Sequence, residues 1–247
     1  MSQPFLSIII PAYNEESRIP STLAQVNEFI QRQSFESEVI VVENGSTDRT
    51  YEIAQAFSLR DACFETIHID QRGKGLAVRQ GMLQARGVHR FMCDADLSMP
   101  VEEINRFLPP LQIDADIAIA SREAPGARRY EEPMYRHLGG RAINLIIRML
   151  ALPGLHDTQC GFKCFRGEVA EDLFSSLTFL GWSFDVEILY IARQRGYKIV
   201  EVPISWYFNP NSKLSLIRDS LRMGMDIWEI RRKGRQGAYR ASGNNGT

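Results

Sequence analysis

The chain lacks the features that mark a membrane-spanning, secreted or nucleic-acid-binding protein. No apolar run reaches the roughly 18–20 residues that a membrane-spanning helix needs, because the best candidate, residues 143–152, contains Arg148. Residues 1–11 carry no cleavage pattern of a leader peptide. The formal net charge is only −1, which gives no reason to expect nucleic acid as a partner. We therefore expect a cytoplasmic protein.

Cysteines and glycine-rich phosphate-binding motifs are also scarce. The four cysteines among 247 residues, Cys63, Cys93, Cys160 and Cys164, have neither zinc-site nor thioredoxin-like spacing. We expect all four to be reduced thiols. The glycine-bearing segment 72–75 matches neither the Walker A pattern nor the dinucleotide fingerprint. Neither a P-loop enzyme nor a Rossmann dehydrogenase is supported.

What the sequence does contain is a regular alternation of short apolar runs and amphipathic segments. We expect strands at residues 5–10, 38–42, 63–69, 89–93 and 116–120. We expect helices at residues 17–33, 46–58 with the cap included, 74–85 and 100–107. Strands separated by helices of this size predict βαβ units, and hence a mostly parallel, Rossmann-like sheet with helices on both faces.

The rhythm changes after residue 121. A polar loop is expected at residues 122–132. Further helices are expected at residues 135–150 and 184–195, further strands at 161–165 and 198–202, and a final amphipathic helix at 214–233. No linker separates two domains, so we expect one α/β domain over residues 1–235. Its two halves, 1–120 and 121–235, would be followed by a flexible tail at 236–247.

The triplet Asp94-Ala95-Asp96 follows the apolar run 89–93 directly. In open α/β sheets, ligands bind at the carboxyl ends of strands. Carboxylate oxygens suit Mg²⁺ or Mn²⁺, and a divalent cation carrying a diphosphate would neutralise two buried carboxylates. The triplet therefore indicates a metal–nucleotide site, although an isolated triplet could equally be two solvated loop carboxylates.

Three other loops end strands at the same edge of the expected sheet. Residues 11–16 offer an aromatic ring and carboxylates to a nucleobase, and residues 43–48 offer further acceptors at a tight turn. In the segment 72–75, glycines precede a helix, so free backbone N–H groups and Lys74 could bind an anion. Each loop alone could be a plain turn, but their convergence favours a common site.

Taken together, these motifs resemble the inverting family-2 glycosyltransferases of GT-A fold. The matching segments are IIIPAYNEE, VIVVENGSTDRT, GKGLAVRQGMLQARG and DADLSMP. The later segments ASR, DTQCGFKCF, GWSFDVEIL and VPISWYFNPNSKLS resemble the dolichyl-phosphate glucosyltransferase and polyprenyl-phosphate mannosyltransferase branch, over about residues 5–225. The resemblance implies Mg²⁺ or Mn²⁺, a polyprenyl phosphate acceptor and a nucleotide-sugar donor, with UDP-glucose preferred and GDP-mannose as the alternative.

The resemblance also implies roles for individual residues. The first half would bind the nucleotide sugar through Pro11, Ala12, Tyr13, Glu15, Glu43, Asn44, Ser46, Lys74, Asp94, Ala95 and Asp96. Of these, Asp94 and Asp96 would bind the metal. The second half would bind the acceptor phosphate through Arg122, Arg136 and Lys213. The catalytic set would be Asp96, Arg122, Asp157, Gln159 and Asp185.

Two chemical alternatives remain for the acceptor. A lipid phosphate is already anionic, so it needs positioning by arginines more than it needs a base. A hydroxyl acceptor would require a carboxylate base, for which Asp185 or Glu187 are the candidates. A catalytically silent nucleotide-sugar-binding module is the non-enzyme alternative.

The segment 213–240 is basic and carries apolar residues at helical spacing. Such a helix can lie on an anionic membrane surface, or it can pack on the sheet with a charged outer face. The first alternative would place the protein peripherally on the cytoplasmic face of a membrane. The oligomeric state is not encoded in any pattern that we recognise.

Overall fold

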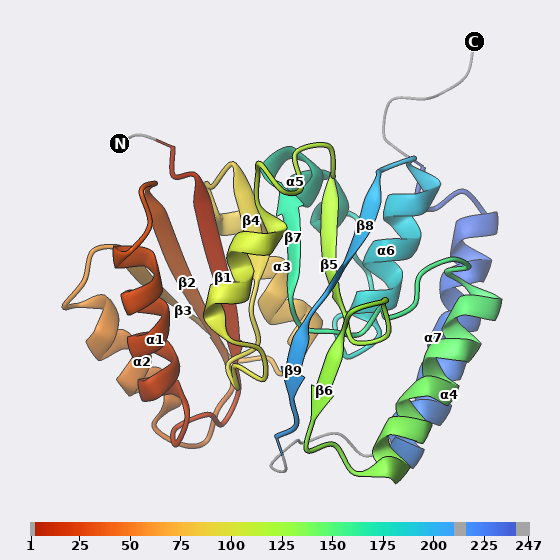
Figure 1. The fold of residues 1–247 in the computed structure, drawn as a ribbon, viewed down its shortest axis with the longest axis horizontal. Coiled ribbons are helices and arrows are strands. Elements are labelled where there is room, and N and C mark those ends of the chain that lie inside the picture. Colours follow the sequence, from red (N-terminus) through yellow and green to blue (C-terminus); the bar gives the residue numbers. More distant parts are fainter. Residues whose placement is uncertain (1–2, 210–215, 241–247) are drawn as a thin grey trace.

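Seven strands form the central sheet. The computed structural model describes residues 3–209 and 216–240, and the strands lie in the order β3-β2-β1-β4-β7-β5-β8 (Figure 1). Their bounds are β1 (Leu6–Ala12), β2 (Ser37–Asn44), β3 (Phe64–Ile69), β4 (His89–Met92), β5 (Ile117–Ser121), β7 (Lys163–Arg166) and β8 (Ile199–Pro203). Neighbours are parallel, except that β7 runs antiparallel to both β4 and β5. The expected mostly parallel α/β sheet is confirmed.

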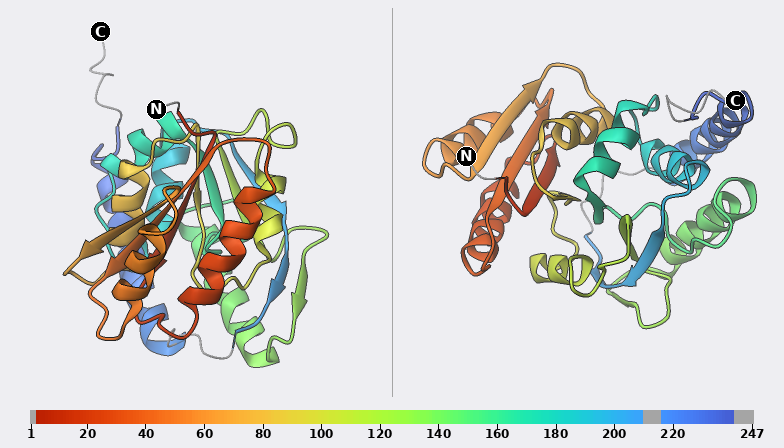
Figure 2. Two further views of the ribbon diagram at one scale, coloured as in Figure 1. Left: turned by 90° about the vertical axis from the view of Figure 1, so that its left-hand side faces the viewer. Right: turned by 90° about the horizontal axis from the view of Figure 1, so that it is seen from above.

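Helices cover both faces of this sheet (Figure 2). One face carries α1 (Ile19–Gln31), α2 (Thr50–Ser58) and the 3₁₀-helix η1 (Val101–Phe107), and the other carries α3 (Lys74–Gln84), α5 (Gly167–Ser175) and α6 (Phe184–Gln194). The inner strands are apolar on both sides for this reason: in β1, Ile8 and Ile10 pack against one helical layer, while Ile9 packs against the other.

The second half of the chain extends this architecture beyond the carboxyl ends of β5 and β8. A two-stranded parallel ribbon, β6 (Arg128–Tyr130) and β9 (Ser205–Tyr207), lies beyond the ends of β5 and β8. The helices α4 (Met134–Leu150) and α7 (Leu216–Arg235) stand side by side at the β8 side of the sheet. The strand β6 was expected to be loop, because its pairing partner is 77 residues away in the register Arg128↔Ser205 and leaves no local signal.

Two sequence expectations about the remaining chain need correction. Helix α5 was not expected, although it buries Val169 and Leu173 in the core. The flexible tail does not begin at residue 236, because Tyr239 is 1% exposed and donates a hydrogen bond to Glu187. The end of the expected tail, residues 241–247, lies outside the described residues.

Other expectations agree with the structure. All four cysteines are free thiols. None of the helices in the described part of the chain combines the length and the apolar character needed to cross a membrane. Helix α7 is amphipathic as expected, since it buries Met223, Ile227 and Ile230.

Candidate functional site

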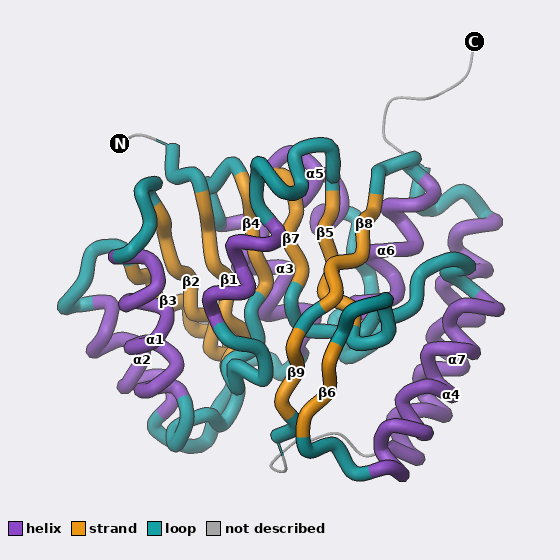
Figure 3. The backbone as a smooth tube through the Cα atoms, in the orientation of Figure 1, coloured by secondary structure: helices purple, strands orange, loops and turns teal. Residues whose placement is uncertain are grey.

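The loops that follow β1, β2 and β4 gather with the loop before β7 at one edge of the sheet (Figure 3). Strand β7 is antiparallel to β4, and its first residue, Lys163, pairs with Met92 at the end of β4. The loop 157–162, which precedes β7, therefore lies at this edge. The expected metal-binding residues and the expected catalytic residues of the second half therefore meet across β4 and β7.

Asp94 lies between a lysine and a glycine. The Lys74 Nζ is 2.7 Å from Asp94 Oδ1. On the other side is Gly161, where an added Cβ would lie only 1.7 Å from Asp94 Oδ2. Only a residue without a side chain fits at position 161 while the carboxylate keeps this position. Lys74 also lies over the ring of Trp182, with its Nζ 5.3 Å from the ring centroid.

Asp96 is partly buried beside Asp94. Burial and the neighbouring charge of Asp94 raise the pKa of Asp96, while its Oδ1 accepts a hydrogen bond from the Ser98 N–H at 3.0 Å. Two neighbouring carboxylates form a donor set that a hard divalent cation suits. Within residues 3–209 and 216–240, no cluster of three or more His, Cys, Asp or Glu side chains could hold a metal ion. Asp94 and Asp96 would therefore share a cation with ligands from outside the protein, such as diphosphate oxygens.

The glycines of the segment 72–75 have a different role from the one expected. The N–H groups of Gly75 and Leu76 donate to the carbonyls of Gly181 and Leu180, so these helix-terminal donors are already used. A Cβ at Gly73 would lie 2.6 Å from the Leu180 oxygen. These glycines allow the loop 179–183 to pack against the start of α3. Lys74 alone points its charge at the site, where the carboxylates of Asp94 and Asp185 raise its pKa although burial acts in the opposite direction.

The loops after β1 and β2 are bound tightly to each other. Asn14 adopts a positive φ of 52°, its N–H donates to Ser46 Oγ, and its Oδ1 accepts from the Thr47 N–H. The Glu15 N–H donates to Thr50 Oγ1 at 2.8 Å. Tyr13 stacks with Arg72, whose guanidinium carbon is 4.9 Å from the ring centroid. The expected base-binding residues thus lie on or next to two loops, after β1 and after β2, that are hydrogen-bonded to each other.

Glu43 is hydrogen-bonded to the second of these loops, the one that follows β2. Its side chain is 1% exposed, its Oε1 accepts from the Ser46 N–H and its Oε2 contacts His68 Nδ1 at 2.5 Å. This hydrogen bond raises the pKa of His68. Asn44 beside it is also buried. His68 was not singled out in the sequence, since its partner lies on the neighbouring strand and only the register of β2 and β3 brings them together.

Arg122 and Asp157 lie across β7 from the carboxylate pair. The Arg122 Nε is 2.6 Å from Asp157 Oδ2, and Nη2 is 2.9 Å from Oδ1. Although burial alone would raise it, the guanidinium lowers the pKa of Asp157 to about 2. Trp206 of β9 lies against Arg122 and Arg129, at 5.5 and 5.8 Å from the guanidinium carbons to the ring centroid. Trp206 was not identified from the sequence.

The other expected catalytic residues occupy less accessible positions. Gln159 turns toward α7, where its Nε2 donates to Met223 Sδ at 3.1 Å. Asp185 is almost fully buried and pairs with Lys163 at 2.5 Å. Glu187, the other candidate base, is fully buried and accepts hydrogen bonds from the Thr178 and Phe179 N–H groups. Both candidate bases are therefore engaged inside the protein.

Arg136 and Lys213 are the other expected acceptor-binding residues. Arg136 lies in the first turns of α4, which begins near the site edge. Lys213 lies outside the described residues. Lys163 was also not identified from the sequence, although a lysine between Phe162 and Phe165 in an otherwise apolar strand was a visible signal.

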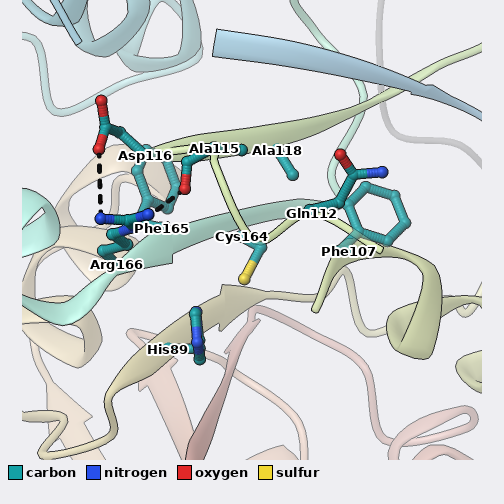
Figure 4. A pocket seen from close by; sticks show the side chains of 9 residues that line it. All are labelled: His89, Phe107, Gln112, Ala115, Asp116, Ala118, Cys164, Phe165 and Arg166. Atoms are coloured by element: carbon teal, nitrogen blue, oxygen red, sulfur yellow. Dashed lines mark hydrogen bonds and ion pairs between the residues drawn. The ribbon is translucent and has the colours of Figure 1, made fainter. Parts of the chain in front are cut away.

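Two hollows lie at the opposite edge of the sheet. The first is a cavity of about 10 Å³ between the start of β4, the end of β7 and the start of β5, lined by His89, Cys164 and Arg166 among others (Figure 4). The second, wider one adjoins it with about 590 Å³. Both lie at the amino ends of the parallel strands, whereas open α/β sheets bind ligands at the carboxyl ends.

Comparison with known proteins yields one consistent group. The family described as Glycosyl transferase family 2 matches residues 7–174. A dolichyl-phosphate beta-glucosyltransferase of Drosophila melanogaster is 36% identical over 255 residues, which cover 95% of this chain and 77% of the relative. The enzyme of the same name from Homo sapiens is 34% identical over 254 residues, with the same coverage of 95% and 77%.

A solved structure extends the comparison to the fold. Glucosyl-3-phosphoglycerate synthase from Mycobacterium tuberculosis, in complex with Mn²⁺, uridine-diphosphate-glucose and glycerol 3-phosphate, matches with a TM-score of 0.64 and 20% identity. The match covers 95% of this chain and 80% of that one. The fold is therefore the GT-A fold that the sequence motifs implied.

Proposed function

The chain belongs to glycosyl transferase family 2, and we propose that it transfers glucose from UDP-glucose to dolichyl phosphate or another polyprenyl phosphate. The observation that carries the proposal is that neither of the two expected bases is available: Asp185 is paired with Lys163, and Glu187 holds backbone N–H groups. A phosphate acceptor needs no base, because its oxygen is already ionised. The names of the Drosophila and human relatives agree with this acceptor class.

In the proposed reaction, a phosphate oxygen of the acceptor attacks the anomeric carbon of the donor glucose. The bond between that carbon and the diphosphate oxygen breaks, UDP leaves with the electron pair, and the configuration inverts. No proton has to be removed from the nucleophile. The protein's contribution is to hold the two phosphate groups at opposite sides of the sugar, which is worth several kcal/mol in well-positioned reactants.

The donor diphosphate would be held at Asp94 and Asp96 through a divalent metal. Mg²⁺ or Mn²⁺ bound there would supply positive charge that stabilises the leaving diphosphate. The Mn²⁺ and uridine-diphosphate-glucose in the Mycobacterium tuberculosis structure support this choice of cofactor and donor. Tyr13 and the hydrogen-bonded loops after β1 and β2 would bind the uracil and ribose, with Lys74 near the diphosphate.

The acceptor phosphate would bind on the far side of the sugar at Arg122. Asp157 engages Nε and Nη2 of this guanidinium, which orients it and leaves Nη1 to face the acceptor. Arg136 and Lys213 complete the proposed phosphate-binding set. The two halves of the domain, residues 1–120 and 121–235, then correspond to donor binding and acceptor binding.

The lipid acceptor requires access to a membrane, and helix α4 supports peripheral binding to the cytoplasmic face. Its exposed side chains include Met134 at 71% and Met149 at 67%, together with the charged side chain of Arg141. Leu145, Ile146 and Leu150 are exposed beside them, and Trp228 on the adjacent α7 is 66% exposed. A helix that exposes both apolar side chains and arginines is suited to the interface of an anionic bilayer.

The function is tested with purified protein, two donors and two matched acceptors. UDP-glucose or GDP-mannose would be incubated with dolichyl phosphate or with dolichol, each with Mn²⁺, with Mg²⁺ or with EDTA. We expect glucosyl transfer to dolichyl phosphate only, and only with a divalent metal. Because the two acceptors differ by the phosphate alone, transfer to dolichol without transfer to dolichyl phosphate would overturn the proposal.

A further inference from the structure

Lys163, the first residue of β7, is a buried cation for which the proposed reaction has no role. Its side chain is 1% exposed. Its Nζ donates to the Cys160 carbonyl at 2.6 Å and to Asp185 Oδ1 at 2.5 Å. Burying an ammonium group is costly unless it is paired and hydrogen-bonded. The lysine therefore links the Cys160 backbone to the Asp185 carboxylate.

The Cys160 carbonyl belongs to the turn that packs on Asp94. The next residue, Gly161, approaches so closely that an added Cβ would lie 1.7 Å from Asp94 Oδ2 and 2.2 Å from Cγ. On the opposite side, Lys74 contacts Asp94 Oδ1 at 2.7 Å. The position of the Asp94 carboxylate is thus limited by Lys74 on one side and by the Cys160–Gly161 turn on the other.

We propose that Lys163 is a positioning residue for Asp94. By joining the Cys160 carbonyl to Asp185, which lies on α6, it fixes the Cys160–Gly161 turn against the carboxylate that would share the metal–diphosphate. Asp185 is then the counter-ion of this lysine and not a base. The inference rests on the proposed function, since the position of Asp94 matters only where Asp94 binds a metal–nucleotide.

The test measures UDP binding by calorimetry, in Mn²⁺ and in EDTA, without any acceptor or sugar transfer. Lys163→Met should weaken Mn²⁺-dependent UDP binding by about ten-fold or more, the usual effect of losing a residue that orients a metal ligand. Binding in EDTA should be unchanged. Since Lys163→Met leaves a lone buried carboxyl, the double variant Lys163→Met/Asp185→Leu replaces the ion pair with apolar side chains. It should show the same selective loss.

Two controls separate positioning from general destabilisation. Cys164→Ala removes buried volume from the next residue of β7 without touching the turn, and it should leave Mn²⁺-dependent binding within about two-fold of wild type. In an Asp94→Asn background, Lys163→Met should cause no further loss, because both changes act on the same carboxylate. An additive loss, or wild-type binding by both Lys163 variants, would overturn the inference.

The outcome also distinguishes this inference from the proposed function. A wild-type protein that binds UDP with Mn²⁺ but transfers nothing to dolichyl phosphate would contradict the proposed acceptor and leave the role of Lys163 intact. A wild-type protein without Mn²⁺-dependent UDP binding would overturn both.

Discussion

Arg122 and Asp157 form a bidentate ion pair, in which Nε lies 2.6 Å from Oδ2 and Nη2 lies 2.9 Å from Oδ1. The backbone N–H of Arg122 donates to the same carboxylate at 3.0 Å. The pair joins the end of β5 to the loop that precedes β7, and Asp157 is fully buried. Such a pair orients the guanidinium for a second anion and makes the surrounding loops depend on the ionised state of one carboxyl group.

Stability should therefore fall at low pH in a way that depends on Asp157. Its pKa is about 2 in the folded protein against an ordinary value of 3.8. A lowered pKa stabilises the fold above the ordinary value, and this stabilisation, about 2 kcal/mol, is lost as the pH falls through 3.8 toward 2. Urea unfolding from pH 6 to pH 2.5 should show the stability difference between wild type and Asp157→Asn shrinking below pH 4. A difference that stays constant over this range would contradict the assignment.

Gly161→Ala should remove the metal-dependent function while the fold survives. The new methyl group would overlap the Asp94 carboxylate, so the carboxylate must rotate away from its present position. We expect Mn²⁺-dependent UDP binding to weaken by at least about ten-fold. The matched control is Gly181→Ala, where no atom lies within 4 Å of an added Cβ. Equal binding by the two variants would show that Asp94 does not need this position.

Glu187→Gln should affect stability and leave the chemistry unchanged. Glu187 accepts hydrogen bonds from two backbone N–H groups, from the Thr178 hydroxyl and from Tyr239. An amide has one acceptor oxygen instead of two, so unfolding free energy should fall by about 1–3 kcal/mol. Tyr239→Phe, which removes one of these bonds, should cost about 1 kcal/mol. A kcat that falls a hundred-fold in Glu187→Gln, with the fold intact, would instead identify it as the base.

Met149→Asp should weaken binding to vesicles of phosphatidylcholine and phosphatidylglycerol. Withdrawing one buried apolar side chain from the bilayer interface costs about 1.5–3 kcal/mol, so the partition coefficient should fall about ten-fold or more. Leu111→Asp is the control, because Leu111 is similarly exposed at 66% but lies outside α4 and α7. If sedimentation with vesicles is the same for both variants, α4 is not the membrane-binding surface.

Much of the fold could be predicted from local sequence patterns. The apolar run that forms β1 and the helical spacing of Leu23 and Val26 in α1 are local signals, and the structure confirms both elements. Strand β6 could not be found in this way, since Arg128–Tyr130 is polar and becomes a strand only by pairing with β9. The antiparallel insertion of β7 between β4 and β5 is likewise a tertiary choice.

For the candidate site, too, local sequence patterns indicate some of the neighbouring residues and not others. Asp94 and Asp96 were identifiable because they follow an apolar strand, and the structure brings Lys74 to Asp94. The partners of Asp185 and Glu187 were not, because Lys163 and Tyr239 reach them from distant segments. The sequence indicates which residues lie near this edge of the sheet. Tertiary packing determines which of their side chains are already engaged by other groups of the protein, as Asp185 and Glu187 are.

The placement of β7 limits how relatives of this protein could be recombined. Residues 163–166 come from the second half of the sequence, yet they pair with β4 of the first half on one side and with β5 on the other. Dividing the chain at residue 120 would leave β4 without its partner β7. It would also remove Gly161, which packs against the Asp94 carboxylate. A chimera joined at this point would therefore have to take β4, β7 and β5 from the same parent protein.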